Sequence, residues 1–406
     1  MDLPSLAATP RQQVLPYGRV VNFSAGPACM PIEVLLEAQQ EFVNWRGCGM
    51  SIMEMSHRGR YYLKMMEETK GRLASLLHLP QSHHLLFMQG GATLQFAAQP
   101  LNMLRGLGDS ADYVVTGTWS QYALKEASKF GKMRVAAENT ANGFVDLPPV
   151  KEWTLNPNAA YVHYCDNETV HGLEFPRTPD LSKARATRIR LTSDMSSNFC
   201  SRPIDIDAHA LIYAGAQKNM GPAGVTVVIA RDDVLGKELA TCPAMCSYGL
   251  CCKADSALNT PPVFAVYMVG LMSKYIQERG GLETWSRVCE AKAQRLYEVI
   301  DASENFYVCP VKKDARSRMN VRFLVAGASA ERAEDGADAQ GCSAVKENEA
   351  LKKKFLREAE ERGLYHLAGH RALGGCRASL YTGMPNEGVE ALAAFMKEFA
   401  EENSEA

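Results

Sequence analysis

Apolar residues recur at helical spacing near the start of the chain. They predict helices over Pro31–Asn44 and Tyr61–Leu79, because positions three and four apart share one face of a helix. The apolar face of the second predicted helix holds Leu63, Met66, Leu73, Leu76 and Leu77. Pro31 suits the first turn of the earlier helix, where its missing N–H is not needed.

Short apolar runs then alternate with helical stretches as far as residue 230. The runs predict strands at Leu85–Met88, Tyr113–Val115, Met133–Ala137, Ala160–Tyr164, Arg188–Leu191 and Val225–Ala230. The stretches between them predict helices at Thr93–Leu104 and Ser120–Phe130. Strands that alternate with helices are typical of an α/β domain with a largely parallel sheet.

The pattern changes near residue 275, where a smaller α+β domain is predicted. Its expected elements are a helix at Leu282–Ile300, strands at Phe306–Val308 and Met319–Val325, a helix at Glu347–Arg362 and a last helix from Asn386. We therefore expect a large domain over residues 21–275, whose first residues can pack on the small domain, and a small domain over 276–406. Residues 1–20 are expected to be a disordered leader. The acidic, small-residue stretch Ala326–Glu347 is expected to be a mobile surface insertion.

Composition narrows the classes of function. The chain has 406 residues, 46% hydrophobic and 22% charged, with a formal net charge of −2. These values are typical of a globular protein and give no basic field for nucleic acid. No apolar run approaches the roughly 18–20 residues that span a bilayer. The first residues lack the apolar core of a secretory signal, so we expect a cytoplasmic protein, with a weak organelle presequence left as the alternative.

Twelve cysteines raise the question of disulfides or metal. They are scattered, and a chain of this size needs no disulfides to fold. The densest group is Cys242, Cys246, Cys251 and Cys252. The adjacent pair in that group does not fit a simple tetrahedral zinc site. The sequence thus favours reduced thiols and no metal.

The segment Tyr213–Gly224 is the most informative part of the chain. It places Lys218 in a loop of small residues between the apolar runs Ala210–Ala216 and Val225–Ala230. Burial lowers the pKa of an amine, and a neutral amine attacks carbonyl groups. Upstream, Asp194 ends a run that resembles a strand. A carboxylate for the pyridine nitrogen and an amine for the aldehyde are what pyridoxal phosphate requires.

Six motifs occur in one order along the chain. They are Phe23–Pro27, Glu54–Gly59, Gly117–Trp119, Gly215–Pro222, Asn259–Pro262 and Gly369–Ser379. Together they resemble the phosphoserine aminotransferases, class V members of the aspartate-aminotransferase fold, from about Val21 to Phe399. The resemblance implies a fold type I transferase with a large domain around a mostly parallel, seven-stranded-type sheet. It also implies pyridoxal phosphate as the cofactor and amino transfer between glutamate and a phosphorylated keto acid.

The resemblance assigns roles around the cofactor. Lys218 matches the Schiff-base lysine, and Asp194 matches the carboxylate that keeps the ring nitrogen protonated. Trp119 matches the aromatic residue that stacks on the ring, and Thr169 matches the hydroxyl near O3′. The residues matched to the phosphate are Ala92, Thr93 and Gln217. Gln89–Gln95 also fits that role locally, because a glycine-rich turn that opens a helix offers free N–H groups to an anion.

Other residues are matched to the partner subunit and to the substrate. Asn259 and Thr260 match residues that reach the cofactor phosphate from the other subunit of a homodimer. Arg377 matches the arginine that grips the α-carboxylate as a bidentate pair. The cluster matched to the phosphate or the glutamate side chain consists of His57, Arg58, His370 and Arg371. The substrates implied are small molecules only.

The chain departs from part of the family at Thr93, where an arginine can help to bind substrate. That departure leaves the strength of phosphate binding open. Another class V aminotransferase, acting on alanine, serine or glyoxylate, is the nearest alternative, although it does not need two His-Arg pairs. A cysteine desulfurase would need a histidine where Gln217 stands. A catalytically silent relative would be expected to lack Lys218 or Asp194, and both are present.

Overall fold

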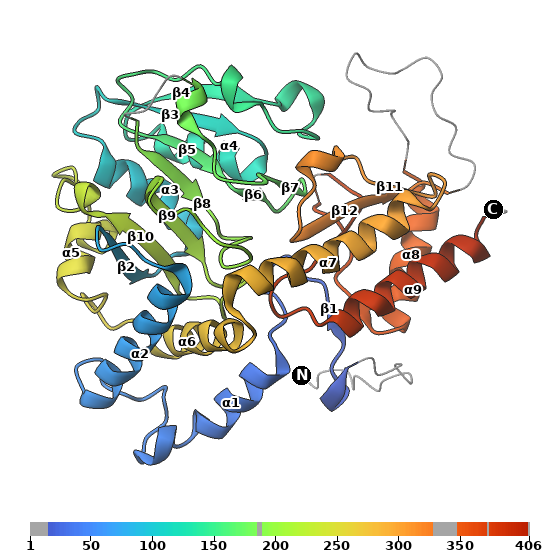
Figure 1. Cartoon of the computed structure of the whole chain (residues 1–406), viewed down its shortest axis with the longest axis horizontal. Helices are drawn as coiled ribbons and strands as arrows, with labels where there is room; N and C mark the ends of the chain where they lie inside the picture. The colour runs from blue at the N-terminus through green and yellow to red at the C-terminus, as the bar shows by residue number, and fades with distance from the viewer. Residues whose placement is uncertain (1–14, 185–188, 328–346, 372, 405–406) are drawn as a thin grey trace, which may run out of the picture.

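The computed structural model describes residues 15–184, 189–327, 347–371 and 373–404, and its centre is a seven-stranded sheet (Figure 1). The strands, in spatial order, are β2 (His83–Met88), β10 (Thr226–Arg231), β9 (His209–Gly215), β8 (Leu191–Asp194), β5 (Val162–Cys165), β3 (Ser110–Val115) and β4 (Lys132–Glu138). Only β10 runs against its neighbours, pairing antiparallel with both β2 and β9. The predicted α/β fold with a mostly parallel sheet is confirmed.

Helices cover both faces of this sheet. They are α1 (Ile32–Phe42), α2 (Arg60–Leu77), α3 (Gly91–Met103), α4 (Thr118–Ala127), α5 (Tyr248–Lys253) and α6 (Val263–Glu278). Strand β10 shows how the faces divide, because alternate side chains of a strand point to opposite sides. Val227 and Ile229 join the core formed with α1, α2 and α6, whereas Val228 and Ala230 join the core formed with α3, α4 and α5.

Most predicted elements are present within a few residues of their expected bounds. The strand expected at Arg188–Leu191 was wrong in position, since β8 begins at Leu191 and ends at Asp194. The face predicted for α2 was partly wrong, because Leu63 is 53% exposed. The buried face of α2 carries Tyr62, Met65, Met66, Thr69, Leu73, Leu76 and Leu77. The structure also contains α6, which was not predicted.

A second core lies in the C-terminal part. It contains the antiparallel strands β11 (Tyr307–Val308), β12 (Asn320–Val325) and β14 (Cys376–Ser379) with helices α7 (Gly281–Asp301), α8 (Glu349–Glu361) and α9 (Asn386–Glu402). Strand β1 (Val21–Asn22) pairs with β13 (Leu364–Tyr365) and buries Val21 in this core. In Figure 1, α7 extends from the large sheet to the C-terminal sheet. It contributes Trp285 to the first core and Leu296 to the second.

The two segments expected to be unstructured lie mainly outside the described residues. Of the predicted leader, only residues 15–20 are described. They include a 3-10 turn at Pro16–Gly18, and Arg19 donates a hydrogen bond to the carbonyl of Met30 at 3.0 Å. Of the predicted insertion, only Ala326, Gly327 and Glu347 are described, and Ala326 is buried with its N–H bonded to the carbonyl of Phe306.

Within the described part of the chain, no helix is long and apolar enough to cross a membrane. The same residues contain no group of three histidine, cysteine or acidic side chains that could hold a metal ion. The cysteines among them are all free thiols.

A tight contact at Gly383 joins the start of the chain to the segment after β14. A Cβ at this position would lie 2.0 Å from the carbonyl oxygen of Cys29 and 2.6 Å from its carbon. We expect Gly383→Ala to lower the free energy of unfolding by about 1–3 kcal/mol, because the backbone must shift to make room.

Urea denaturation measures this effect, with Gly71→Ala as the matched control. Gly71 lies inside α2 with no atom within 4 Å of its Cβ position. Alanine there should stabilise the protein by about 0.5–1 kcal/mol. Equal stability of the two variants would contradict the proposed role of this contact.

Candidate active site

A cavity of about 380 Å³ opens at the carboxyl ends of the parallel strands. Strand β8 ends there at Asp194, β5 leads there into Thr169, and β9 leads there into the Lys218 loop. This edge is where open α/β sheets bind their ligands. The predicted site residues that line the cavity are Ala92, Thr93, Trp119, Thr169, Asp194, Gln217, Lys218, His370 and Arg377.

Lys218 lies within this cavity beside a hydroxyl group. Its Nζ donates a hydrogen bond of 2.7 Å to Oγ1 of Thr169. Burial lowers the pKa of Lys218, and the nearby Asp194 partly opposes that shift. The backbone at Gly26 passes close by, since a Cβ there would lie 3.1 Å from Cγ of Lys218. The side chain is thus confined and its neutral form is favoured.

Asp194 is 5% exposed. Its Oδ1 accepts a hydrogen bond of 2.8 Å from the backbone N–H of Ser196. Among the described residues, no lysine, arginine or histidine forms an ion pair with it. Burial raises the pKa of Asp194, while the Ser196 hydrogen bonds and Lys218 oppose the shift. A cationic ring nitrogen would therefore gain a buried carboxylate that has no other ionic partner.

Trp119 is held at the start of α4 by a residue that sequence reasoning missed. Glu168 is fully buried. Its carboxylate accepts hydrogen bonds from the N–H of Trp119 at 3.1 Å, from the N–H of Ser120 at 2.8 Å and from Oγ of Ser120 at 2.6 Å. The sequence feature that could have indicated this role is the charged residue between Asn167 and Thr169. The Lys218 Nζ lies 5.4 Å from the Trp119 ring centroid.

The start of α3 supplies backbone donors to the cavity. Gly90 adopts a φ of 89° before this helix, and no side chain caps the helix start. The first N–H groups of a helix have no partner within it, so those of Gly91, Ala92 and Thr93 are available to an anion. Gly90 cannot be replaced easily, because a Cβ there would lie 2.6 Å from the side chain of Leu94.

Arg377 on β14 brings a guanidinium group to the lining of the cavity. Its Nη1 donates to the carbonyl of Thr169 at 3.4 Å, and its Nε is buried without a hydrogen-bond partner. Burial lowers the pKa of Arg377. An arriving carboxylate would satisfy this guanidinium.

Five predicted site residues do not line this cavity: His57, Arg58, Asn259, Thr260 and Arg371. The ring of His57 packs edge-on to Tyr62 with centroids 6.4 Å apart. Arg58 and Arg371 are exposed. Asn259 and Thr260 are also exposed, and their oxygens accept hydrogen bonds from Gln89 at 3.4 and 3.2 Å.

The cavity's side chains match the chemistry of pyridoxal phosphate. They provide an amine, a buried carboxylate without a cationic partner, a hydroxyl group, an indole and a helix start. The match rests on Nε of Arg377 and Nε1 of Trp119, which are buried without a partner, and on Asp194, which forms no ion pair among the described residues.

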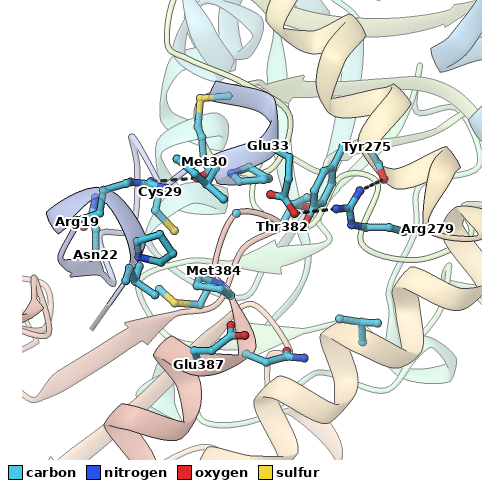
Figure 2. Close-up of a pocket in the computed structure, with 18 of the residues that line it drawn as sticks. Arg19, Asn22, Cys29, Met30, Glu33, Tyr275, Arg279, Thr382, Met384 and Glu387 are labelled. Carbon is cyan, nitrogen blue, oxygen red and sulfur yellow. Dashed lines mark hydrogen bonds and ion pairs between the residues drawn. The ribbon is translucent and has the colours of Figure 1, made fainter. Parts of the chain in front are cut away.

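A larger cavity of about 520 Å³ lies between α1, α7 and the segment after β14 (Figure 2). It contains none of the predicted site residues. Figure 2 shows that Arg279 is already engaged by Glu33, at 2.8 Å, and by the carbonyl of Tyr275. Arg279 and Glu33 satisfy one another, and the described residues that line this cavity include no lysine and no aspartate, which are the reactive groups of the smaller one.

Comparison with known proteins agrees with this geometry. The family model Aminotransferase class-V matches residues 20–392. The chain therefore belongs to the class V aminotransferases, whose cofactor is pyridoxal phosphate.

Several relatives narrow the family further. A phosphoserine aminotransferase of Laribacter hongkongensis is 47% identical over 381 residues, covering 94% of this chain and 98% of the relative. One from Drosophila melanogaster is 44% identical, covering 95% and 99%. The solved enzyme of Bacillus circulans subsp. alkalophilus is 44% identical with a TM-score of 0.86, covering 95% and 99%. A pyridoxal-phosphate-bound one from Trichomonas vaginalis is 39% identical with a TM-score of 0.83, covering 93% and 100%. Within its class, the chain belongs to the phosphoserine aminotransferases.

Burial of the Lys218 amine predicts how the free energy of unfolding depends on pH. In the cofactor-free protein, the pKa of Lys218 is lowered by folding. The amine of Lys218 therefore binds a proton more tightly in the unfolded chain than in the folded one. Stability contributed by this group therefore rises with pH up to about 10.4, the pKa of an ordinary lysine. We expect Lys218→Met to be more stable than wild type at pH 7, with a difference that narrows toward pH 10.

Urea denaturation of the cofactor-free proteins across pH 7–10 measures this difference. Lys237→Met, at an exposed position, is the control and should show no such narrowing. Parallel pH curves for wild type and Lys218→Met would contradict the prediction.

Proposed function

We propose that this chain transfers an amino group from L-glutamate to 3-phosphohydroxypyruvate, giving O-phospho-L-serine and 2-oxoglutarate in a ping-pong reaction of serine biosynthesis. The observation that carries the proposal is the meeting of Lys218, Thr169, Asp194 and Arg377 in one cavity. An amine, a proton-holding carboxylate and a carboxylate-binding arginine are the groups that amino transfer needs.

Each residue has a separate task in this proposal. Bound pyridoxal phosphate supplies an electron sink for the negative charge that develops at the substrate Cα. Asp194 would hold a proton on the ring nitrogen. The Nζ of Lys218 would take the proton from Cα and deliver it to the cofactor carbon C4′. Trp119 would lie against the ring, and Thr169 would hydrogen-bond the ring hydroxyl.

The remaining residues would bind the anionic groups of the cofactor and the substrate. Ala92, Thr93 and Gln217 hold the cofactor phosphate, with the start of α3 providing N–H groups. Arg377 holds the substrate α-carboxylate. His57, Arg58, His370 and Arg371 hold the phosphate or the glutamate side chain, because a guanidinium fork suits both kinds of anion.

The cavity is completed by a second copy of the chain in this proposal. Asn259 and Thr260 are exposed and do not line the cavity of their own chain, so a homodimer brings them to the partner's cofactor phosphate. Arg58 is also exposed and away from the cavity of its own chain, and we propose that it and the neighbouring His57 likewise serve the partner's site. We further propose a division into residues 21–275 and 276–406, and a cytoplasmic location.

Single half-reactions of the purified holoenzyme test the substrate. We expect O-phosphoserine to bleach the visible absorbance of the cofactor at least about tenfold faster than serine or alanine, since it alone carries a distal anion that a charge-assisted hydrogen bond can hold. Stopped-flow absorbance measures the three rates. Equal rates would keep the aminotransferase and reject phosphoserine as its substrate.

Mixing of variant subunits tests the shared site. Lys218→Ala and Asn259→Ala/Thr260→Ala should each be nearly inactive alone. A hybrid dimer contains one subunit of each variant. If Asn259 serves the partner's site, one site of the hybrid lacks both Lys218 and Asn259, and the other site has both and is wild type. Random mixing should then restore about a quarter of wild-type activity. Failure to restore activity, in a mixture shown by mass spectrometry to contain hybrids, would place Asn259 in its own chain's site.

A further inference from the structure

Arg322 on β12 lies directly opposite Arg377 on β14 in the antiparallel register. Opposed residues of such a pair project from the same face of the sheet. Asn320, two residues before Arg322, shares this face, and its Oδ1 accepts a hydrogen bond of 2.8 Å from Asn167. Asn167 itself lines the cofactor cavity. Arg322 therefore lies on the strand face that meets the active site, beside the cavity-lining Arg377, while it is not itself among the residues that line the cavity.

The immediate neighbours of Arg322 belong to the turn that follows Thr169. A Cβ at Gly172 would lie 3.2 Å from Cβ of Arg322. The adjacent His171 is 3% exposed, and its Nδ1 has no hydrogen-bond partner. Burial lowers the pKa of His171 to about 4, with further lowering by Arg322 and His370. Arg322 and His370 thus both lie near this ring, and His370 lines the cavity.

The two arginines of this strand face, Arg322 and Arg377, have no acidic partner in the described part of the chain. Neither Arg322 nor Arg377 has a carboxylate within ion-pair distance there, and the Nε of each is buried without a partner. Burial lowers the pKa of Arg322 and the charge of Glu347 opposes that shift, but the ion pair of this carboxylate is with Lys352, at 2.7 Å. Arg318, four residues earlier, shows the usual arrangement, since it binds Glu174 at 2.6 Å.

Arg322 and Arg377 thus place two buried Nε donors without partners on one face of the sheet, and buried donors are normally satisfied. An incoming anion would satisfy both donors. A phosphate monoester, with up to about two negative charges, and a side-chain carboxylate, with one, can each accept hydrogen bonds from more than one arginine.

We propose that Arg322 is a substrate-binding residue that, with His370 and beside Arg377, holds the distal anion of the substrate. This inference rests on the proposed function and adds to it a residue that the motif resemblance does not contain. The chemistry recognised is a phosphate monoester or a carboxylate located a few bonds from the amino-bearing carbon.

Half-reactions of the holoenzyme with O-phosphoserine and with L-serine test the proposal. Serine is the matched substrate, since it lacks only the phosphate. We expect Arg322→Gln to slow the reaction with O-phosphoserine about tenfold, as for loss of one charge-assisted hydrogen bond, and to leave that with serine unchanged within about twofold. Arg322→Lys keeps the charge without the fork and should fall between wild type and Arg322→Gln.

Two further measurements make the outcome specific. Inorganic phosphate should inhibit the serine half-reaction of wild type, and Arg322→Gln should need about tenfold more phosphate for the same inhibition. Arg295→Gln is the control, because Arg295 on α7 pairs with Glu390 at 2.9 Å outside the cavity. It should behave as wild type in both assays.

The results separate this inference from the proposed function. A wild-type preference for O-phosphoserine that both Arg322 variants retain would overturn the role of Arg322 alone. Equal slowing with both amino acids would also overturn it, since that result indicates a structural or α-carboxylate role. A wild type without any preference for O-phosphoserine would overturn the proposed function and this inference together. If Arg322→Gln does not fold, Arg322→Lys decides by the same comparison of the two amino acids.

Discussion

The active site depends on the hydrogen bonds of one buried amide, Asn219, next to Lys218. Its Oδ1 accepts from the N–H and the hydroxyl of Thr382 at 3.0 and 3.1 Å, and its Nδ2 donates to the carbonyl of Ser197 at 2.8 Å. These bonds join three parts of the chain: the lysine loop, the turn after β8 and the segment after β14. Because Asn219 is 1% exposed, losing a partner would leave a polar group unsatisfied in the interior. The position of the catalytic amine is therefore coupled to the C-terminal part that carries Arg377.

Burial favours the neutral forms of both Lys218 and Asp194. It lowers the pKa of the Lys218 amine and raises the pKa of the Asp194 carboxyl, because both charged forms lose hydration. In the proposed function, cofactor and substrate bring the complementary charges, namely a ring cation for Asp194 and anions for the arginines. Burial of these groups lowers the stability of the cofactor-free protein, which is typical of a functional site.

Local sequence was enough to predict most of the residues that meet in the cavity around Lys218, since Asp194 ends a strand, Lys218 follows one, and six motifs stand in one order. It was not enough for residues whose partners are distant along the chain. Glu168 acts on Trp119 and Ser120 from 48 or more positions away, and Arg322 acquires its neighbour only through the register of β12 with β14. Helix α6 was missed because it is apolar on nearly every side, which leaves no helical period. Strand β8 was predicted too early in the chain, because charged and apolar residues alternate over Arg188–Leu191, a pattern typical of a half-buried strand.

The reversed strand β10 has a consequence for motion at the active site. Since β9 and β10 are adjacent and antiparallel, the chain between them returns directly, without a crossover helix. Lys218 therefore belongs to the connection 216–225, whose two ends are held by adjacent strands of the sheet. Such a segment has few accessible conformations, so little entropy is lost when its amine is held in one orientation. In the proposed reaction, the side-chain atoms of Lys218 would move while its backbone stays fixed.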